Sequence, residues 1–187
     1  MSEPTIDRAA VAADLERVRA DFGRLLASAD SRDWRAPTSG TRWSNEQLLF
    51  HMVFGYMVVR RLLLLVHVFG RLPDRASRTF ARVLQSATAP FHVVNYYGTC
   101  AAATVYNRDR MGKKMNRVID GLQRSLATED DRALRRGMHF PPGWDPYFRD
   151  YMTLADVYDY PSRHYDHHRR QLTLTNLPPP TLRGDRC

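Results

Sequence analysis

The chain carries the stretch WSNEQLLFH at residues 43–51, and this stretch marks the start of its longest predicted helix. Ser44 followed three residues later by Gln47 is a capping-box pattern, in which each side chain bonds the backbone N–H of the other residue. The apolar residues that follow continue the helix to about Phe69, and Gly70 is the predicted C-cap. An element of this length predicts one member of a helical bundle.

Three further long helices are predicted from apolar residues spaced three and four apart. They cover residues 6–28, residues 108–126, and residues 153 to about 174. Thr153 and Asp156 form a second capping-box-like start, whereas Pro161 predicts a kink or a restart inside the last helix. Four long helices and weak strand signals favour an all-α fold, a four-helix bundle.

The region between the second and third long helices is predicted to hold one short helix and loops. The short helix covers residues 74–86. Residues 90–106 are apolar and aromatic but lack helical periodicity, so the first half of this segment is predicted to be a buried or site-lining loop. Residues 136–149 are rich in glycine and proline and are predicted to be a loop before the last helix.

Length and composition predict one domain and a cytoplasmic protein. The 187 residues fit a single core over about residues 6–175, followed by a proline-containing tail at 176–187. The two cysteines, Cys100 and Cys187, are too few for a disulfide framework. The first residues have no apolar signal region, and no uncharged apolar run reaches the roughly 20 residues of a membrane span, so no membrane partner is expected.

Three of the seven histidines crowd into the stretch SRHYDHHRRQ at residues 162–171. His164 and His168 are four residues apart and share one helix face, so their imidazoles can hold one cation. His164 and His167 can do the same at a spacing of three. The inward stripe through Val157 and Leu172 passes through His164 and His168, which favours that pair, although a solvated polar helix face is an alternative explanation.

His51 is a third candidate ligand, on the second helix. It lies in the apolar stretch LLFHMVFG at residues 48–55, and burying an imidazole without a partner costs about 1–3 kcal/mol. One interpretation is a core histidine hydrogen-bonded to a backbone carbonyl or a tyrosine. The other is a metal ligand that faces the last helix.

The stretch at residues 43–51 together with the late His164-x-x-His167-His168-Arg169-Arg170-Gln171-Leu172 resembles the DinB-like superfamily of four-helix metalloproteins. This group includes bacillithiol and mycothiol transferases. The resemblance covers residues 6–175 and implies that His51, His164 and His168 are the metal ligands. The chain departs from the family's pattern at Arg170, where glycine is frequent, and at Pro161, one turn before the first ligand of the last helix.

The resemblance also implies a chemistry. Three neutral histidines leave a fourth position open, as in catalytic zinc sites, and Zn²⁺ is the expected metal, with Ni²⁺ or Fe²⁺ as alternatives. Such an ion activates water or a small thiol, for example mycothiol or bacillithiol, for transfer to an electrophile, as in a thiol S-transferase or a hydrolase. The alternative is a non-catalytic metal-binding bundle, stress-related or acting as a partner-binding dimer; a homodimer is expected in either case.

Other polar and aromatic residues leave two interpretations open. Gln47 and Gln171 either orient a ligand or are ordinary polar residues at helix ends. Trp43 and Trp144 either wall a pocket or belong to the core, which is the commoner place for large aromatic residues. The sequence identifies no catalytic and no substrate-binding residue, and the three histidines are candidate metal ligands.

The net charge of +8 rests almost wholly on arginine, since Lys113 and Lys114 are the only lysines. The arginines are scattered along every predicted helix and follow no nucleic-acid-binding motif, so no nucleic-acid partner is expected. Arg163, Arg169 and Arg170 flank two of the proposed ligands, and their charge favours an anionic substrate.

Overall fold

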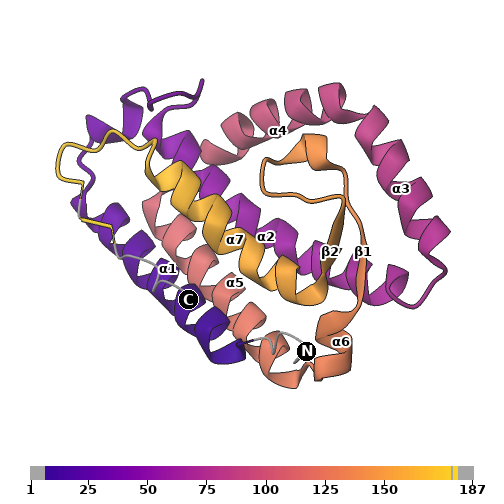
Figure 1. The fold of residues 1–187 in the computed structure, drawn as a ribbon. Coiled ribbons are helices and arrows are strands. Elements are labelled where there is room, and N and C mark those ends of the chain that lie inside the picture. Colours follow the sequence, from indigo (N-terminus) through magenta and orange to yellow (C-terminus); the bar gives the residue numbers. More distant parts are fainter. Residues whose placement is uncertain (1–6, 178, 181–187) are drawn as a thin grey trace.

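The protein is described by a computed structural model, which covers residues 7–177 and 179–180. Four long helices pack around one core, with α5 between α1 and α2, and with α7 against α2 and α1 (Figure 1). The prediction of an all-α four-helix bundle is therefore confirmed. The four helices are α1 (Arg8–Ser28), α2 (Asn45–Phe69), α5 (Arg108–Thr128) and α7 (Leu154–Arg169).

Both predicted capping boxes are present. The Gln47 backbone N–H donates to Ser44 Oγ, and the Ser44 N–H donates to Gln47 Oε1 at 3.0 Å. Thr153 and Asp156 make the same reciprocal pair at the start of α7. Satisfying the free N–H groups of a first turn fixes where a helix begins. The two helices that carry the candidate ligands therefore have defined starts.

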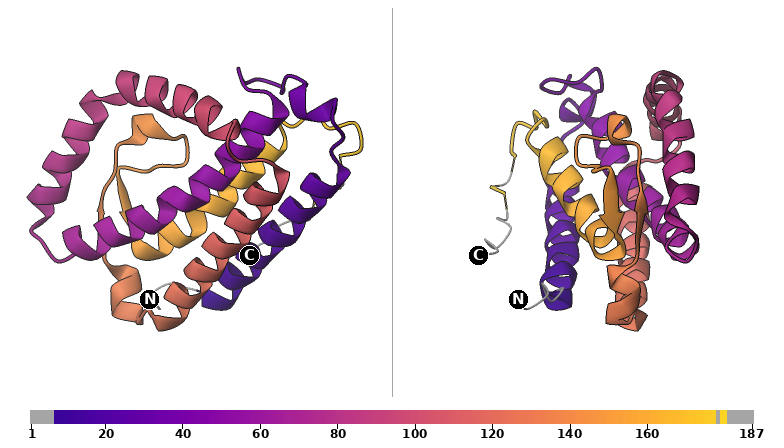
Figure 2. Two further views of the ribbon diagram at one scale, coloured as in Figure 1. Left: turned by 180° about the vertical axis from the view of Figure 1, so that it is seen from behind. Right: turned by 45° about the vertical axis from the view of Figure 1, so that its right-hand side comes forward.

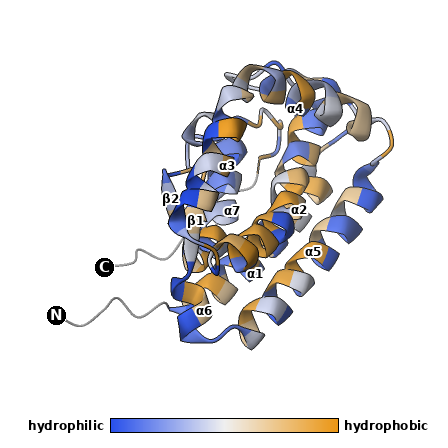
Figure 3. Cartoon of the chain, turned by 90° about the vertical axis from the view of Figure 1, so that its right-hand side faces the viewer, coloured by the Kyte–Doolittle hydropathy of each residue, from blue (hydrophilic) through white to orange (hydrophobic). Residues whose placement is uncertain are grey.

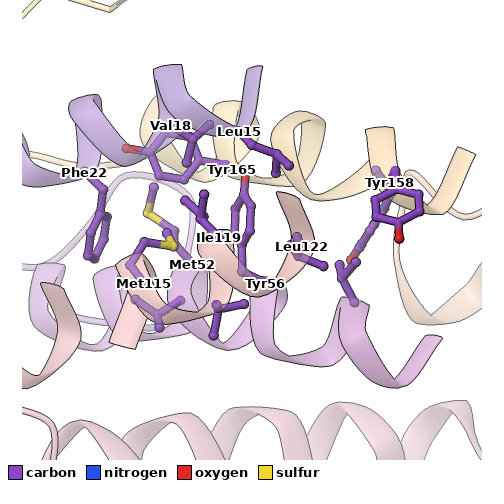
Figure 4. Close-up of a cluster of buried hydrophobic side chains, with 14 of the residues drawn as sticks. Leu15, Val18, Phe22, Met52, Tyr56, Met115, Ile119, Leu122, Tyr158 and Tyr165 are labelled. Carbon is purple, nitrogen blue, oxygen red and sulfur yellow. The ribbon is translucent and has the colours of Figure 1, made fainter. Parts of the chain in front are cut away.

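The core lies between α1, α2, α5 and α7 and is built from the apolar stripes that the sequence predicts. Phe22, Tyr56, Tyr165 and Ile119 are among the residues that fill it, each at most 1% exposed (Figure 4). Each such side chain contributes about 1.5–3 kcal/mol when it is fully buried. Helix α5 carries apolar residues on its inner face and hydrophilic residues on its outer face (Figure 3).

The α2 helix is long and apolar enough to cross a membrane by length and composition alone. In the structure it packs against α7, α5 and α4, which is the position of a core helix in a bundle. Its end at Phe69 with Gly70 as C-cap follows the prediction.

The predicted short helix is present as α3 (Asp74–Ser86), but the predicted loop that follows is wrong. Residues 90–106 lie mostly in a further helix, α4 (Thr88–Ala103). Pro90 is its third residue, in the first turn, where a missing N–H breaks no helical hydrogen bond. Only Thr99 and Ala103 are buried on α4, because it packs on α2 from one side, and this weak burial leaves no clear apolar periodicity.

A loop held by two short strands reaches from α6 (Asp131–Arg135) to α7. Strands β1 (Gly137–His139) and β2 (Tyr151–Thr153) pair antiparallel, with Met138 opposite Met152. The sequence predicted only a loop here, because three-residue strands are too short to show alternation. The loop between them contains a 3₁₀ turn (Pro142–Trp144) and lies within the arch that α3 and α4 form (Figures 1 and 2).

The last helix ends at Arg169 rather than near residue 174 as predicted. Of the two predicted effects of Pro161, a kink or a restart, the restart is absent, because one helix runs through this residue. The chain then leaves the helix because Thr173 N–H donates to Asn45 Oδ1 at 3.0 Å, which holds it against the start of α2. Some predicted positions lie outside the described residues. They are Ile6 at the start of the first predicted helix, and Pro178 and residues 181–187, including Cys187, in the predicted tail.

Candidate metal centre

The three histidines singled out by the sequence lie together. They come from α2 and α7, which pack side by side (Figure 1). His51 comes from α2, whereas His164 and His168 come from successive turns of α7. All three are buried, and one ring nitrogen of each lies within 4.8 Å of the others. His164 Nε2 and His168 Nε2 are 3.2 Å apart. Ligand atoms about 2.0–2.1 Å from a tetrahedral zinc are about 3.3 Å apart, so the spacing of this pair fits such an ion.

The structure also separates the two spacings that the sequence left open. His164 and His168 both face α2, whereas His167 lies to the side, partly exposed, with its ring 5.8 Å from that of Tyr147. His167 is therefore at the rim of the site and not within the cluster of three.

Hydrogen bonds orient the rings of two of the candidate ligands. Gln171 Oε1 lies 2.7 Å from His168 Nδ1, and an amide oxygen only accepts, so Nδ1 carries the proton. The lone pair of His168 Nε2 then points towards His164 Nε2, 3.2 Å away. On the other side of the site, Thr99 Oγ1 lies 3.4 Å from His51 Nδ1. Metal-binding histidines commonly have such a partner on their second ring nitrogen.

The two glutamines play different parts. Gln171 contacts both His168 and His167, which is the arrangement expected of a residue that orients a ligand. The side-chain oxygen of Gln47 accepts the N–H of Ser44 and so belongs to the cap of α2.

Gly55 lets α7 approach α2 closely at the site. It lies one turn after His51 on α2, and a Cβ atom added at this position would lie 2.9 Å from His164 Nδ1. That distance is shorter than a normal contact, so any side chain here would displace the His164 ring. The sequence contains this signal, since Gly55 is the one residue without a side chain in an otherwise apolar turn.

Burial keeps the three imidazoles uncharged. It lowers the pKa of His51 to about 3, with a smaller contribution from the charge of His168. It lowers the pKa of His168 to about 4, although the hydrogen bond to Gln171 acts in the opposite direction. The pKa of His164 is held well below its ordinary value, first by burial and then by the neighbouring histidines. Neutral imidazole is the form that binds a metal ion.

The cluster opens into a cavity of about 280 Å³. Trp43 and Trp144 both line it, as the interpretation as pocket walls predicts, and Trp43 also packs against the core. The Trp43 ring stacks on His51 at 4.4 Å between centroids, and Trp144 stacks on Phe91 at 4.0 Å. The remaining lining residues are mostly aromatic or apolar and include Phe54, Val58, Leu62, Phe148 and Tyr160.

Asp145 is a site residue that the sequence did not reveal. Its Oδ2 lies 3.4 Å from His164 Nε2 and accepts a hydrogen bond from Tyr160 Oη at 2.8 Å. The Tyr147 N–H donates to Oδ1, and the side chain is 11% exposed. Burial raises the pKa of this carboxyl, while these two hydrogen bonds act against the rise. Asp145 lies in the loop between β1 and β2, where no periodicity indicates which side chains point inward.

The arginines expected beside the ligands do not line this cavity. Arg169 is buried against Asp21, with its Nε 2.6 Å from Asp21 Oδ2. Arg163 pairs with Asp159 on the outer face of α7, and Arg170 is exposed at the end of the helix. The expectation that these charges favour an anionic substrate is therefore not supported.

A four-helix bundle with three buried histidines from two neighbouring helices defines a class of candidate metalloproteins. The chain belongs to the DinB superfamily, whose family model matches residues 14–172. Proteins of this superfamily often bind a metal ion. No curated protein and no solved structure matches the chain in the corresponding comparisons.

Proposed function

We propose that this chain binds one divalent metal ion through His51, His164 and His168 and uses it to activate a small molecule. The observation that carries the proposal is the convergence of three neutral, buried imidazoles on a cavity of about 280 Å³. Three histidine ligands with an open side are the pattern of a catalytic rather than a structural zinc site. Zn²⁺ is the expected ion, and Ni²⁺ or Fe²⁺ also suits imidazole ligands.

When bound, such an ion lowers the pKa of a coordinated thiol or water, which makes a nucleophile near neutral pH. The protein's own residues prepare the site. Gln171 fixes the proton of His168 on Nδ1, so Nε2 is available for the ion. The stacked Trp43 ring restricts the orientation of His51.

Asp145 and Tyr160 form a second polar group beside the histidines. The carboxylate lies 3.4 Å from His164 and is held by the Tyr160 hydroxyl, so a negative charge is placed next to the proposed cation. The aromatic walls around it limit the access of water, which strengthens electrostatic interactions inside the cavity.

The proposed reaction is transfer of a small thiol to an electrophile, with hydrolysis by an activated water as the related alternative. Mycothiol and bacillithiol are the thiols that the family resemblance suggests, and we expect the reaction to take place in the cytoplasm. The experiment is to assay the metal-loaded protein and the His51→Ala variant with these thiols and a panel of electrophiles. Turnover that a chelator abolishes and that zinc restores, and that the variant lacks, supports the proposal. Turnover that persists in the chelated protein contradicts it.

A non-catalytic metal-binding bundle that forms a dimer is the second candidate. The observation in its favour is the apolar, exposed end of α2, where Leu64 is 55% and Val68 is 49% exposed on one face. Large apolar groups on one face of a helix often mark a protein interface. Light scattering on the wild type and the Leu64→Glu variant tests the dimer. This candidate predicts bound metal, a dimer that the substitution dissociates, and no turnover with any thiol.

A further inference from the structure

A second cavity of about 330 Å³ adjoins the candidate metal centre, between α2 and α4. Phe54, Phe91 and Asn95 line both cavities, so the two share a wall. Thr99 lines the second cavity but not the first, and its Oγ1 lies 3.4 Å from His51 Nδ1. The other residues that line it are Phe50, Met57, Val94, Gly98, Ala102 and Tyr106.

The linings of the two cavities share a chemical character. Aromatic and aliphatic side chains dominate both, and among the described lining residues there is no arginine or lysine. The one carboxylate is that of Asp145, which is negative when ionised. Arg42 lies over the Tyr96 ring at 4.5 Å and lines neither cavity. The walls of the second cavity, which lie away from the proposed cation, therefore offer no opposite charge to an anionic ligand, and burying such a charge there without a partner is costly.

We propose that the two cavities together bind an uncharged molecule with an aromatic or alkyl body, which is the electrophile of the proposed reaction. The apolar body lies in the cavity between α2 and α4, and the reacting end reaches the histidines past Phe54 and Phe91. The position of the reacting end depends on the proposed function; the class of ligand depends only on the cavity walls. Binding is driven by removing apolar surface from water.

Gly98 offers a way to fill the second cavity without disturbing the fold. It lies in the cavity wall on α4, and a Cβ atom added there meets nothing within 4 Å. Gly98→Leu therefore places a side chain in open space and raises the helix propensity of α4. Gly23→Leu is the matched control, because Gly23 lies on the exposed face of α1 and its added Cβ also meets nothing within 4 Å.

The test uses two fluorescent probes that differ by one sulfonate group. N-phenyl-1-naphthylamine is uncharged, and 1-anilinonaphthalene-8-sulfonate carries the same rings with a negative charge. We expect the uncharged probe to bind the wild type at least about tenfold more tightly, which corresponds to about 1.4 kcal/mol. We expect Gly98→Leu to weaken that binding about tenfold, and Gly23→Leu to leave it unchanged.

Val94→Lys supplies the charge that the cavity lacks. Val94 lines the second cavity and is 69% exposed, so the fold tolerates a lysine there. We expect this variant to improve binding of the sulfonate probe at least about threefold, because a nearby cation offsets part of the cost of burying its charge.

Equal affinity of the wild type for the two probes, or equal binding by the two glycine variants, would overturn the inference. Both probes are measured on metal-loaded and chelated protein. If the protein binds no metal ion but still binds the uncharged probe more tightly, the proposed function is refuted and this inference stands. If the protein binds a metal ion but does not distinguish the two probes, this inference is refuted and the proposed function stands.

Discussion

The buried polar side chains on the two sides of α7 have different kinds of partner. On the side towards α1, Asp21 accepts hydrogen bonds from Arg169 Nε at 2.6 Å and from Tyr165 Oη at 2.8 Å. On the side towards α2, His164 and His168 turn neutral nitrogen atoms towards each other at 3.2 Å. The first side is completed by charges within the chain, whereas we propose that the second is completed by a bound cation. The buried polar residues of α7 thus form two groups. Arg169 and Tyr165 have a partner within the chain, whereas His164 and His168 are the candidate ligands of an ion.

The largest expected effect lies on the α1 side. Asp21→Ala removes the carboxylate that contacts Arg169 and Tyr165 in the interior. Breaking a buried ion pair by deleting one partner costs about 3–5 kcal/mol, so the free energy of unfolding should fall by about that amount. Urea denaturation of the metal-free protein measures it.

The double variant Asp21→Ala with Arg169→Met is the control for this effect. Removing both charges leaves no buried cation without its carboxylate, because Arg24, which also pairs with Asp21 at 2.9 Å, is 45% exposed to solvent. The double variant should therefore recover most of the lost stability. A double variant as unstable as Asp21→Ala would contradict the assignment of this pair as an electrostatic unit.

Gly55 tests the close approach of α7 to α2 on the other side. In Gly55→Ala the new Cβ lies 2.9 Å from His164 Nδ1, so the ring must move. Overpacking of this kind costs about 1–3 kcal/mol, and we expect weaker zinc binding as well. Gly23→Ala is the matched control and should be neutral or slightly stabilising, because its Cβ enters open space. Unchanged zinc affinity in Gly55→Ala would show that the ring position is not critical.

The two glutamines sharpen the contrast between orienting a ligand and capping a helix. Gln171→Leu removes the acceptor of His168 Nδ1 and should weaken zinc binding about 10–100-fold. Gln47→Ala removes half of a capping box and should cost about 1 kcal/mol of stability with zinc affinity unchanged. Competition with a chromophoric chelator gives both affinities. Equal zinc affinities in the two variants would contradict the difference in roles.

A further expected effect is the pH dependence of the stability of the metal-free protein. Burial lowers the pKa of His51 to about 3, whereas in the unfolded chain a histidine titrates at about 6.5. The unfolded state therefore takes up a proton first, and stability falls as the pH drops from about 6.5 towards 3. Replacement of His51 by Leu should reduce this loss between pH 7 and pH 5, measured by urea midpoints. An equal loss in both proteins would place the titrating group elsewhere.

The sequence predicted the parts of the fold that carry strong local signals. The starts of α2 and α7 follow from Ser44 and Thr153, whose caps need only residues three positions away. The histidine face of α7 follows from helical geometry, because His164 and His168 align with buried Val157.

The parts that the sequence did not predict depend on contacts made across the fold. The α4 helix packs mainly on α2 and buries only Thr99 and Ala103, so its composition shows no periodicity and Pro90 suggests a loop. Asp145 reaches the site because Trp144 Nε1 donates to the Leu84 carbonyl at 2.9 Å, which pins the loop to α3. Such a contact joins residues about sixty positions apart and leaves no local pattern.

The central claim is that His51, His164 and His168 hold one cation on the α2 side of α7. The most direct measurement is the zinc content and zinc affinity of the purified protein, determined by elemental analysis and competitive titration, for the wild type and the His164→Ala variant. His167→Ala is the matched control, since His167 lies next to the cluster but outside it. We predict about one tightly bound zinc per chain in the wild type and the control, and its loss in His164→Ala. A wild type without stoichiometric metal, or a His164→Ala variant that retains it, would contradict the account.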